Sequence, residues 1–451
     1  MTAATLGWLG IVRLGLVQTA LGAVVVLTTS TLNRVMVVEL ALPAMLPGLL
    51  VALHYAVQMT RPRWGHGSDV GGRRTPWIIG GIGVLAAGGV LAAVATALME
   101  IQFHAGVALA VVAFTLIGIG VGAAGTSLLV LLAKRVDPGR RAAAATIVWV
   151  MMIAGFIVTT AIAGHHLDPF STTRLVVVTS VVSVAAFALA IVAVWGVEGH
   201  GTVAADPAAK SQLSFRTALA EVWDEPQARR FTIFVALSMF AYSAQDLILE
   251  PYAGTVFGLT PGQSTKLSGV QHGGVLLGMV MVALLATGLR GVRIGSLRAW
   301  TVGGCLASAV ALLAIVAGGY GSASWPIETL VFCLGLANGA FAVAAIGSMM
   351  ALAGEGRPGR EGVRMGLWGA AQAIAFGLGG VTGAGASDIV RLLTGSTLHG
   401  YTSVFVVEAG LFVVAAVLAH RVGTIQRSGG VRAEPRLTNL GQSLLPAGSE
   451  V

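Results

Sequence analysis

Two short polar clusters interrupt a chain that is otherwise strongly apolar, and both contain residues able to form ion pairs. Each cluster places an amide, then a charged residue, then a glutamate: Asn33, Arg34 and Glu39 in the first, and Gln245, Asp246 and Glu250 in the second. Charges within or near a membrane are costly and generally need partners. We therefore predict that Arg34 pairs with Asp246 or Glu250 and closes the periplasmic side. The alternative is that these charges reach the membrane interface independently.

A third polar segment runs from Gly65 to Arg74. It resembles the G-x-x-x-D-R-x-G-R-R signature of the major facilitator superfamily at five positions, namely Gly65, Asp69, Gly72, Arg73 and Arg74. It departs from the signature at Val70, where an arginine is usual. The resemblance implies a latch on the cytoplasmic face, in which the carboxylate meets a helix N-terminus or an arginine. An ordinary basic loop would explain the arginines but not the spaced glycines and aspartate.

Composition indicates which solvent surrounds the chain. Hydrophobic residues make up 56% of its 451 residues and charged residues only 10%, whereas soluble domains carry roughly a quarter charged residues. A water-soluble fold could not be covered with so few charges, so membrane lipid is the expected environment. The net charge of +8 does not indicate nucleic-acid binding, because the cations are dispersed between apolar runs and form no basic stripe.

Apolar runs of membrane-spanning length recur from end to end and predict an all-α polytopic membrane protein with twelve transmembrane helices. The predicted spans are 14–38, 43–61, 76–98, 104–132, 143–164, 172–195, 230–251, 266–289, 298–319, 327–352, 363–386 and 401–420. They form an N-terminal six-helix bundle (1–195) and a C-terminal six-helix bundle (230–420). The polar stretch 196–229 is predicted to be a cytoplasmic connector, and 421–451 a disordered cytoplasmic tail.

Basic residues are sorted unequally between the two sets of loops. The termini and the loops on the side of the connector hold every lysine and arginine except Arg34, Arg174, Lys266 and Arg391. Cytoplasmic loops of membrane proteins carry such an excess of cations. Both termini are therefore predicted to be cytoplasmic, as an even number of spans requires them to share a side.

The two halves repeat weakly. Gly118-x-x-x-Gly122 recurs as Gly335-x-x-x-Gly339, and Pro138-Gly139-Arg140 recurs as Pro358-Gly359-Arg360, each pair at corresponding places. Parallel six-span repeats are the plan of the major facilitator superfamily. Glycine is frequent, with 62 residues, so chance is the alternative. Together with the span count and the central connector, the repeat predicts a major facilitator fold of two pseudo-symmetric bundles.

Three longer segments carry a narrower resemblance, which extends over roughly residues 6–420 by motif order. They are TLNRVMVVELALPA (31–44), HYAVQMTRPRWGHGSDVGGRRTPW (54–77) and SAQDLILEPYAG (243–254). They resemble the PucC/LhaA, or bacteriochlorophyll-delivery, branch of the superfamily. Within that branch, the compact loop after the second span is most similar to members labelled bacteriochlorophyll synthase 44.5 kDa chain.

The resemblance implies a multi-pass protein of the bacterial inner membrane, in its intracytoplasmic photosynthetic form. It implies bacteriochlorophyll or a late precursor as bound ligand, and bacteriochlorophyll synthase and light-harvesting apoproteins as partners. We expect a membrane carrier or assembly factor that takes bacteriochlorophyll from the terminal synthesis step to light-harvesting apoproteins. Two alternatives stay open: an alternating-access transporter of another small solute, and a subunit of bacteriochlorophyll synthase.

Catalysis by this chain alone is not expected. Joining a prenyl diphosphate to a chlorin requires carboxylates that hold Mg²⁺ and the diphosphate, and the predicted cytoplasmic loops contain no N-D-x-x-x-D pair. Asp246 and Glu250 have suitable spacing but belong to the predicted periplasmic side. Glu408 is the one carboxylate near the middle of a predicted span, which is little support for ion coupling.

Four residues are candidate contacts for a pigment. His54 and His272 stand at roughly equivalent places in the two halves, and a neutral imidazole can fill the axial position of a chlorin magnesium. A hydrogen bond to a neighbouring hydroxyl or carbonyl is the alternative role. Trp149 and Trp368 could stack on a pigment ring, although anchoring at the membrane interface explains such tryptophans more simply.

Overall fold

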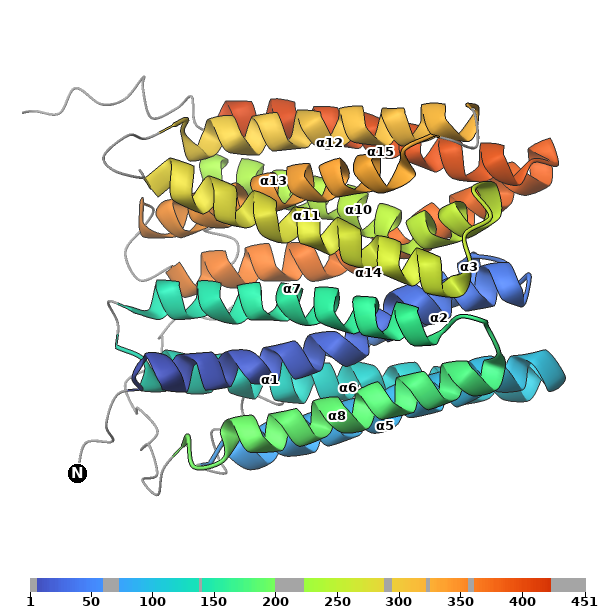
Figure 1. Ribbon diagram of the computed structural model, residues 1–451. Coiled ribbons are helices and arrows are strands. Elements are labelled where there is room, and N and C mark those ends of the chain that lie inside the picture. Colours follow the sequence, from blue (N-terminus) through green and yellow to red (C-terminus); the bar gives the residue numbers. More distant parts are fainter. Residues whose placement is uncertain are drawn as a thin grey trace, which may run out of the picture.

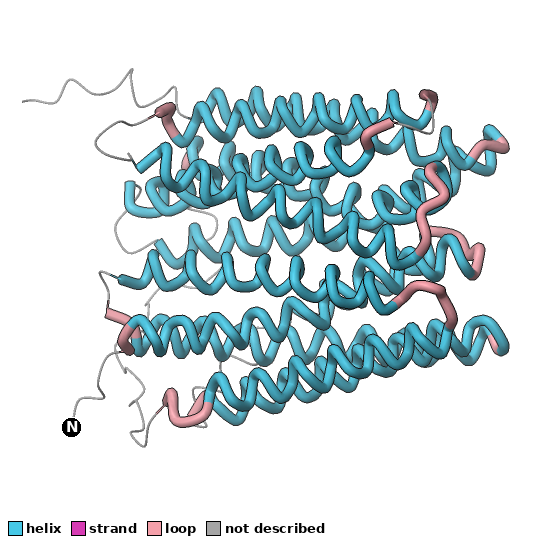
Figure 2. Tube along the Cα trace, in the orientation of Figure 1, coloured by secondary structure: helices cyan, strands magenta, loops and turns pink. Residues whose placement is uncertain are grey.

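The computed structural model describes residues 6–59, 73–137, 140–198, 223–287, 294–321, 325–355 and 361–422. Helices occupy most of these residues, and no β-strand occurs among them (Figure 2). Eleven of the helices described are long and apolar enough to cross a membrane, and a further apolar helix, α3, is shorter. The predicted all-α polytopic architecture is confirmed.

Each predicted span overlaps one helix or one continuous helical run. The first run comprises α1 (Trp8–Val26), η1 (Leu27–Thr31), α2 (Leu32–Arg34) and η2 (Val35–Glu39). The other helices of the N-terminal half are α3 (Met45–Gln58), α5 (Thr75–Ile101), α6 (Phe103–Arg135), α7 (Arg141–His166) and α8 (Thr172–Val194). Those of the C-terminal half are α10 (Pro226–Val256), α11 (Pro261–Thr287), α12 (Leu297–Gly319), α13 (Ile327–Glu355), α14 (Glu361–Thr394) and α15 (Thr397–Val422).

The helices form two bundles, each around its own apolar core (Figure 1). The first core is drawn from residues 6–197, with Leu247 added from the other half, and the second from residues 231–419. Helices α1 and α10 begin, and α8 and α15 end, at the same end of the molecule (Figure 1). We call this the connector end and the opposite one the far end. Most of the predicted connector and nearly all of the predicted tail lie outside the described residues.

Close approach of helix backbones is achieved through glycine at equivalent places in the two halves. A Cβ on Gly118 of α6 would lie 2.7 Å from the carbonyl oxygen of His54 in α3. A Cβ on Gly335 of α13 would collide with the carbonyl oxygen of Gln271 in α11. Since lipid is as apolar as the side chains, such packing is a main source of helix association in membranes. The repeated glycine motif therefore marks equivalent helix contacts, α6 with α3 and α13 with α11.

The two halves meet along two helix pairs, α3 with α14 and α7 with α11, and the first span also contacts α10. Figure 1 shows α7, α11, α14 and α3 between the outer helices of the two bundles. Ile153 of α7 packs against Val275 and Met279 of α11 in an apolar cluster. Gly48 of α3 faces Ala384 of α14, whose Cβ would lie 3.1 Å from an added Cβ.

Replacing Gly335 tests the packing of α13 on α11. In Gly335→Ala the new Cβ meets backbone atoms of α11, which cannot rotate away as a side chain can. Overpacking of this kind lowers the free energy of unfolding by roughly 1–3 kcal/mol. We expect a clearly lower Tm in detergent by thermal unfolding. Gly303→Ala is the control, because a Cβ there has no neighbour within 4 Å. Equal Tm values for the two variants would contradict this account.

Candidate functional site

Hydrogen bonds between the two halves gather toward the far end, and we call the residues that make them the far-end seal. The seal comprises Ser30, Thr31, Asn33, Arg34, Ala44, Met45 and Asp168 in the N-terminal half, and Leu247, Glu250, Leu259, Thr260, Gly262, Thr265, Ser268 and Asp388 in the C-terminal half. Both polar clusters singled out in the sequence therefore contribute residues to one site.

Two aspartates of the seal each cap a helix of the opposite half. Asp388 of α14 accepts hydrogen bonds from the backbone N–H groups of Ala44 and Met45, at 3.1 and 2.8 Å, where α3 begins. Asp168, in the turn after α7, accepts from the backbone N–H of Gly262 at 3.1 Å and the hydroxyl of Thr260 at 2.8 Å, where α11 begins. A carboxylate satisfies the unpaired N–H groups of a helix start and complements its positive dipole. The two halves thus hold each other reciprocally.

Arg34 lies inside the seal, with 2% of its surface exposed. Its guanidinium forms an ion pair with Glu39 of the same span and donates a hydrogen bond of 2.7 Å to the carbonyl of Leu259 across the interface. The predicted ion pair with Asp246 or Glu250 is therefore wrong. The flanking π-helical segments, whose backbone bonds join residues five apart, bring Glu39 alongside Arg34. The burial of Arg34 also excludes the alternative that this residue reaches the membrane interface independently.

Asn33 uses a backbone acceptor that a proline sets free. In α10 the carbonyl of Leu247 would ordinarily accept from the N–H four residues later, but that residue is Pro251, which has none. The side-chain amide of Asn33 donates to this carbonyl at 2.5 Å. The hydrogen bond from Asn33 in the first span to the carbonyl that Pro251 leaves free in the seventh thus binds the two spans together.

The remaining polar residues of the two clusters lie around this bond. Glu250 is 3% exposed and accepts a hydrogen bond from the Ser30 hydroxyl across the interface. Asp246 lies 3.5 Å from the side-chain nitrogen of Gln271 in α11. Gln245 is fully buried, and its amide has no hydrogen-bond partner in the part of the chain that the structure describes.

At the connector end, Glu198 ties together three helices of the N-terminal half. Its carboxylate accepts from the backbone N–H groups of Arg74 and Thr75, at 2.6 and 2.8 Å, where α5 begins. Its backbone carbonyl, just after α8, accepts from the guanidinium of Arg135 at the end of α6 at 2.5 Å. Burial alone would raise the pKa of Glu198, but its bonds to Thr75 and Arg74 and the charge of Arg73 outweigh burial and lower that pKa.

Glu198 supplies the carboxylate at the start of the helix that follows the predicted latch. Of the latch residues, Gly65, Asp69 and Gly72 lie outside the described residues. Arg73 is exposed, whereas Arg74 is 2% exposed. The latch as a whole stays a prediction.

The two candidate histidines are enclosed and hydrogen-bonded within their own helices. His54 is 1% exposed, and its Nε2 lies 2.8 Å from the side-chain nitrogen of Gln58. His272 is 7% exposed, its Nδ1 lies 2.8 Å from the carbonyl oxygen of Ser268, and its ring meets that of Phe156 edge-on at 4.8 Å. The contact of His272 agrees with the alternative role left open for it, a hydrogen bond to a carbonyl, whereas His54 meets the side-chain amide nitrogen of Gln58 and neither a hydroxyl nor a carbonyl in that contact.

The two candidate tryptophans differ in exposure. Trp368 is 1% exposed and packs against Phe231, at 4.9 Å between ring centroids, in the core of the C-terminal half. Its predicted stacking on a pigment ring is therefore wrong, because core side chains occupy the space around the indole. Trp149 of α7 is 41% exposed and stays a candidate.

Comparison with known proteins adds the family. The family model described as "PUCC protein" matches residues 31–426, which include both polar clusters. The chain belongs to the PUCC protein family. It is 56% identical to the "Bacteriochlorophyll synthase 44.5 kDa chain" of Rhodobacter capsulatus, over 95% of this chain and 98% of that one. It is 29% identical to "Protein PucC" of the same species, over 93% of each chain.

Solved structures confirm the fold of this PucC-family chain. A mutant of the nucleoside transporter NupG superimposes with a TM-score of 0.68 at 14% identity, over 92% of this chain and all of that one. The peptide transporter POT in complex with sulfate gives a TM-score of 0.65 at 15% identity, over 94% of this chain and 97% of that one. The predicted major facilitator fold of two six-helix bundles is confirmed.

In this PucC-family protein the aspartate caps were not found by sequence reasoning. Asp168 follows α7 and Asp388 lies within the last turns of α14, whereas a capping residue is normally sought just before the helix that it caps. The sequence feature that could have identified these two aspartates is that they stand at corresponding positions in the two halves. Among the described residues, no group of three or more His, Cys, Asp or Glu side chains could hold a metal ion.

Removing both aspartate caps should loosen the far end. Each cap replaced by alanine costs roughly 1 kcal/mol, so the far end of Asp168→Ala/Asp388→Ala should open about tenfold more often or more. Maleimide labelling of a cysteine placed at Val37, which packs beside Ala44 and Ala384, reports the opening. The exposed Cys333 is first replaced by alanine.

The control for the double variant is Asp224→Ala, at an exposed aspartate next to α10 on the connector side. Its labelling rate should equal that of the parent. An unchanged rate in the double variant would show that the caps do not hold the far end closed.

The contribution of Glu198 should depend on pH. Because its pKa is lower in the folded protein than its ordinary value of 4.5, the stability that it adds is complete above that pH and is lost as pH falls through the folded pKa. Glu198→Gln should therefore lower Tm at pH 7 and approach the parent in acid. Thermal unfolding across this range, with the exposed Glu100→Gln as control, measures the difference. A constant gap at all pH values would contradict the assignment.

Proposed function

We propose that this protein is a non-enzymatic membrane carrier or assembly factor that binds bacteriochlorophyll and delivers it to light-harvesting apoproteins. The observation that carries the proposal is the identity of 56%, along nearly the whole chain, to a protein named as a chain of bacteriochlorophyll synthase. Identity at that level over 95% of this chain and 98% of the relative supports a shared task. The relatives named PucC support the same branch.

The described side chains support a carrier more than a catalyst. Asp246 and Glu250 have the spacing of a diphosphate-binding pair, but Glu250 is bonded to Ser30 across the interface and Asp246 lies against Gln271 of its own half. Carboxylates engaged in this way among packed helices do not form an open site for Mg²⁺ and a diphosphate. We accordingly propose that bacteriochlorophyll synthase is a separate partner, which hands over its product.

The proposed cargo also suits the surface of the protein. A bacteriochlorophyll with its isoprenoid tail is apolar and supplies its own magnesium, so it can reach the protein sideways from lipid. His54 and His272 do not fit it in this arrangement, because packed side chains enclose both imidazoles. We propose further that the protein lies in the intracytoplasmic photosynthetic membrane with both termini in the cytoplasm, as its sorted cations indicate.

The proposal predicts a coloured protein. Purified in mild detergent from photosynthetic membranes, the chain should carry bacteriochlorophyll, seen by absorbance and identified by extraction, together with synthase or light-harvesting subunits identified by mass spectrometry. An unrelated twelve-span transporter, purified in parallel from the same membranes, is the control for pigment that adheres non-specifically. A colourless protein that takes up no added bacteriochlorophyll would overturn the proposal.

The printed name of the Rhodobacter capsulatus relative favours a second candidate, a non-catalytic subunit of bacteriochlorophyll synthase. The two are separated by assaying the synthase in membranes that lack this chain. A delivery factor leaves the prenylation rate unchanged while pigment fails to reach the antenna. A subunit lowers the prenylation rate itself.

A further inference from the structure

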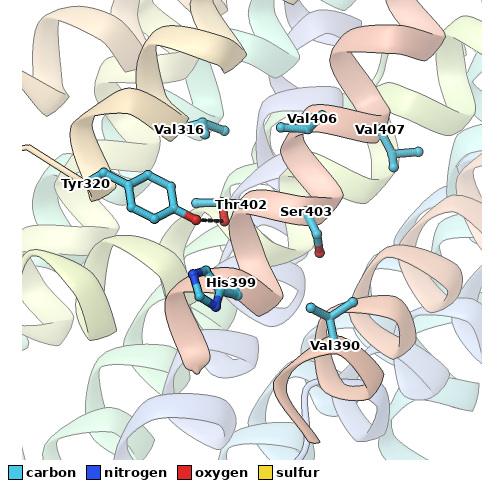
Figure 3. Close-up of a pocket in the computed structure, with 8 residues that line it drawn as sticks. All are labelled: Val316, Tyr320, Val390, His399, Thr402, Ser403, Val406 and Val407. Atoms are coloured by element: carbon cyan, nitrogen blue, oxygen red, sulfur yellow. Dashed lines mark hydrogen bonds between the residues drawn. The ribbon is translucent and has the colours of Figure 1, made fainter. Parts of the chain in front are cut away.

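A groove of about 590 Å³ opens on the surface of the C-terminal bundle near the far end (Figure 3). Helix α15 forms its floor with His399, Thr402 and Ser403 and, one turn further on, two valines. Helix α12 contributes Val316 and Tyr320, and α14 contributes Val390. Volumes of this size are typical of sites for small organic ligands. No residue of the far-end seal and neither candidate histidine lines the groove.

The walls of the groove are apolar, and its one aromatic wall is held in place. Thr402 donates its hydroxyl hydrogen to the carbonyl of Leu398 at 2.8 Å, so in the 3.1 Å contact between Tyr320 and Thr402 the tyrosine is the donor. This bond, drawn in Figure 3, fixes the Tyr320 ring, whose centroid lies 6.0 Å from that of His399. The four valines of the groove, Val316, Val390, Val406 and Val407, supply most of the remaining lining.

His399 differs from the two buried histidines. Its imidazole is exposed, and neither ring nitrogen has a hydrogen-bond partner in the part of the chain that the structure describes. Figure 3 shows the ring on α15 with Tyr320 on one side and Val390 on the other. A neutral imidazole has one nitrogen with a lone pair, and imidazole is the commonest metal ligand in proteins. A metal-binding group thus stands in a groove whose other surfaces suit an apolar ring.

An apolar strip continues from the groove along α15. Val407, Val413, Val414 and Val417 are 61%, 43%, 50% and 47% exposed, and an added Cβ on Gly410 would meet nothing within 4 Å. Residues spaced three and four apart lie on one face of a helix. From Val406 to Val417 the strip is about 16 Å long at 1.5 Å per residue. A linear hydrocarbon chain can lie along it.

We propose that this groove binds a magnesium tetrapyrrole, with His399 as the axial ligand of the metal and the isoprenoid tail along α15. The proposal rests on the proposed function and names the site for its cargo. The valines and the Tyr320 ring enclose an apolar macrocycle, and the imidazole selects a ring that holds a metal over one that does not. A lipid acyl chain would use the walls and the strip but not the imidazole.

The decisive comparison uses two probes, bacteriochlorophyll a and bacteriopheophytin a, which have the same kind of ring and tail but differ in the presence of magnesium. The parent protein should bind the magnesium form more tightly. His399→Leu should weaken that binding by roughly tenfold or more, as loss of ligand support does at metal sites, and should leave bacteriopheophytin binding unchanged. Resonance Raman bands that report the coordination of magnesium should change with the same substitution.

Two further variants complete the experiment. His104→Leu, at an exposed histidine of α6 near the far end of the other half, should bind both probes as the parent does. Ser403→Trp fills the groove from its floor and should weaken both probes alike. Since His399 is exposed, the Tm of His399→Leu should equal that of the parent. If that Tm changes, Ser403→Trp still tests the groove independently.

The outcomes separate the two proposals. If the parent binds bacteriochlorophyll and His399→Leu binds it equally well with unchanged spectra, the site is overturned while the delivery function stands. If both probes bind equally and only Ser403→Trp weakens them, the groove takes an apolar chain and the ligand assignment is overturned. If the parent binds neither probe, the delivery function and the site fail together.

Discussion

In hydrocarbon, every backbone N–H and carbonyl must find a partner within the protein, and at the far end of this molecule many of those partners belong to the opposite half. The start of α3 depends on Asp388 and the start of α11 on Asp168. The carbonyl freed by Pro251 depends on Asn33. The association of the two bundles is therefore part of the backbone hydrogen bonding of each. This constraint explains why polar side chains gather in a region that composition would otherwise keep apolar.

The reciprocity of the caps follows from the internal repeat. Helices α3 and α11 occupy equivalent places, and the glycines that pack α6 on α3 and α13 on α11 are equivalent as well. Each half therefore supplies one aspartate that caps a helix of the other half. The Arg34 cluster breaks this symmetry, because its π-helical turns have no described counterpart in α10. The first span therefore contributes a distinct contact to an otherwise balanced interface.

The sequence predicted the helices well and the partners of individual side chains poorly. Hydrophobic length alone located each span, since an apolar segment of about 20 residues crosses lipid as a helix, which satisfies its own backbone hydrogen bonds. The polar residues around Asn33 and Glu250 were identified because charge in an apolar run is conspicuous. The partner of Arg34 was missed because two π-helical turns change which residues share a face. Asp168, Asp388 and Glu198 were missed because each caps a helix distant in sequence, and His399 because an exposed histidine at a span end has no distinctive spacing.

The proline-freed carbonyl of Leu247 has a further consequence for any movement of the two bundles. Were the far end to part, that carbonyl and two helix starts would lose their partners together, and each bare group in hydrocarbon costs several kcal/mol. Separation must therefore admit water to take the place of the lost donors and acceptors. A water-filled opening between the bundles suits the passage of a polar solute and disfavours an apolar one. An apolar ring with a long hydrocarbon tail would instead move along the outer surface of the protein, in contact with lipid throughout.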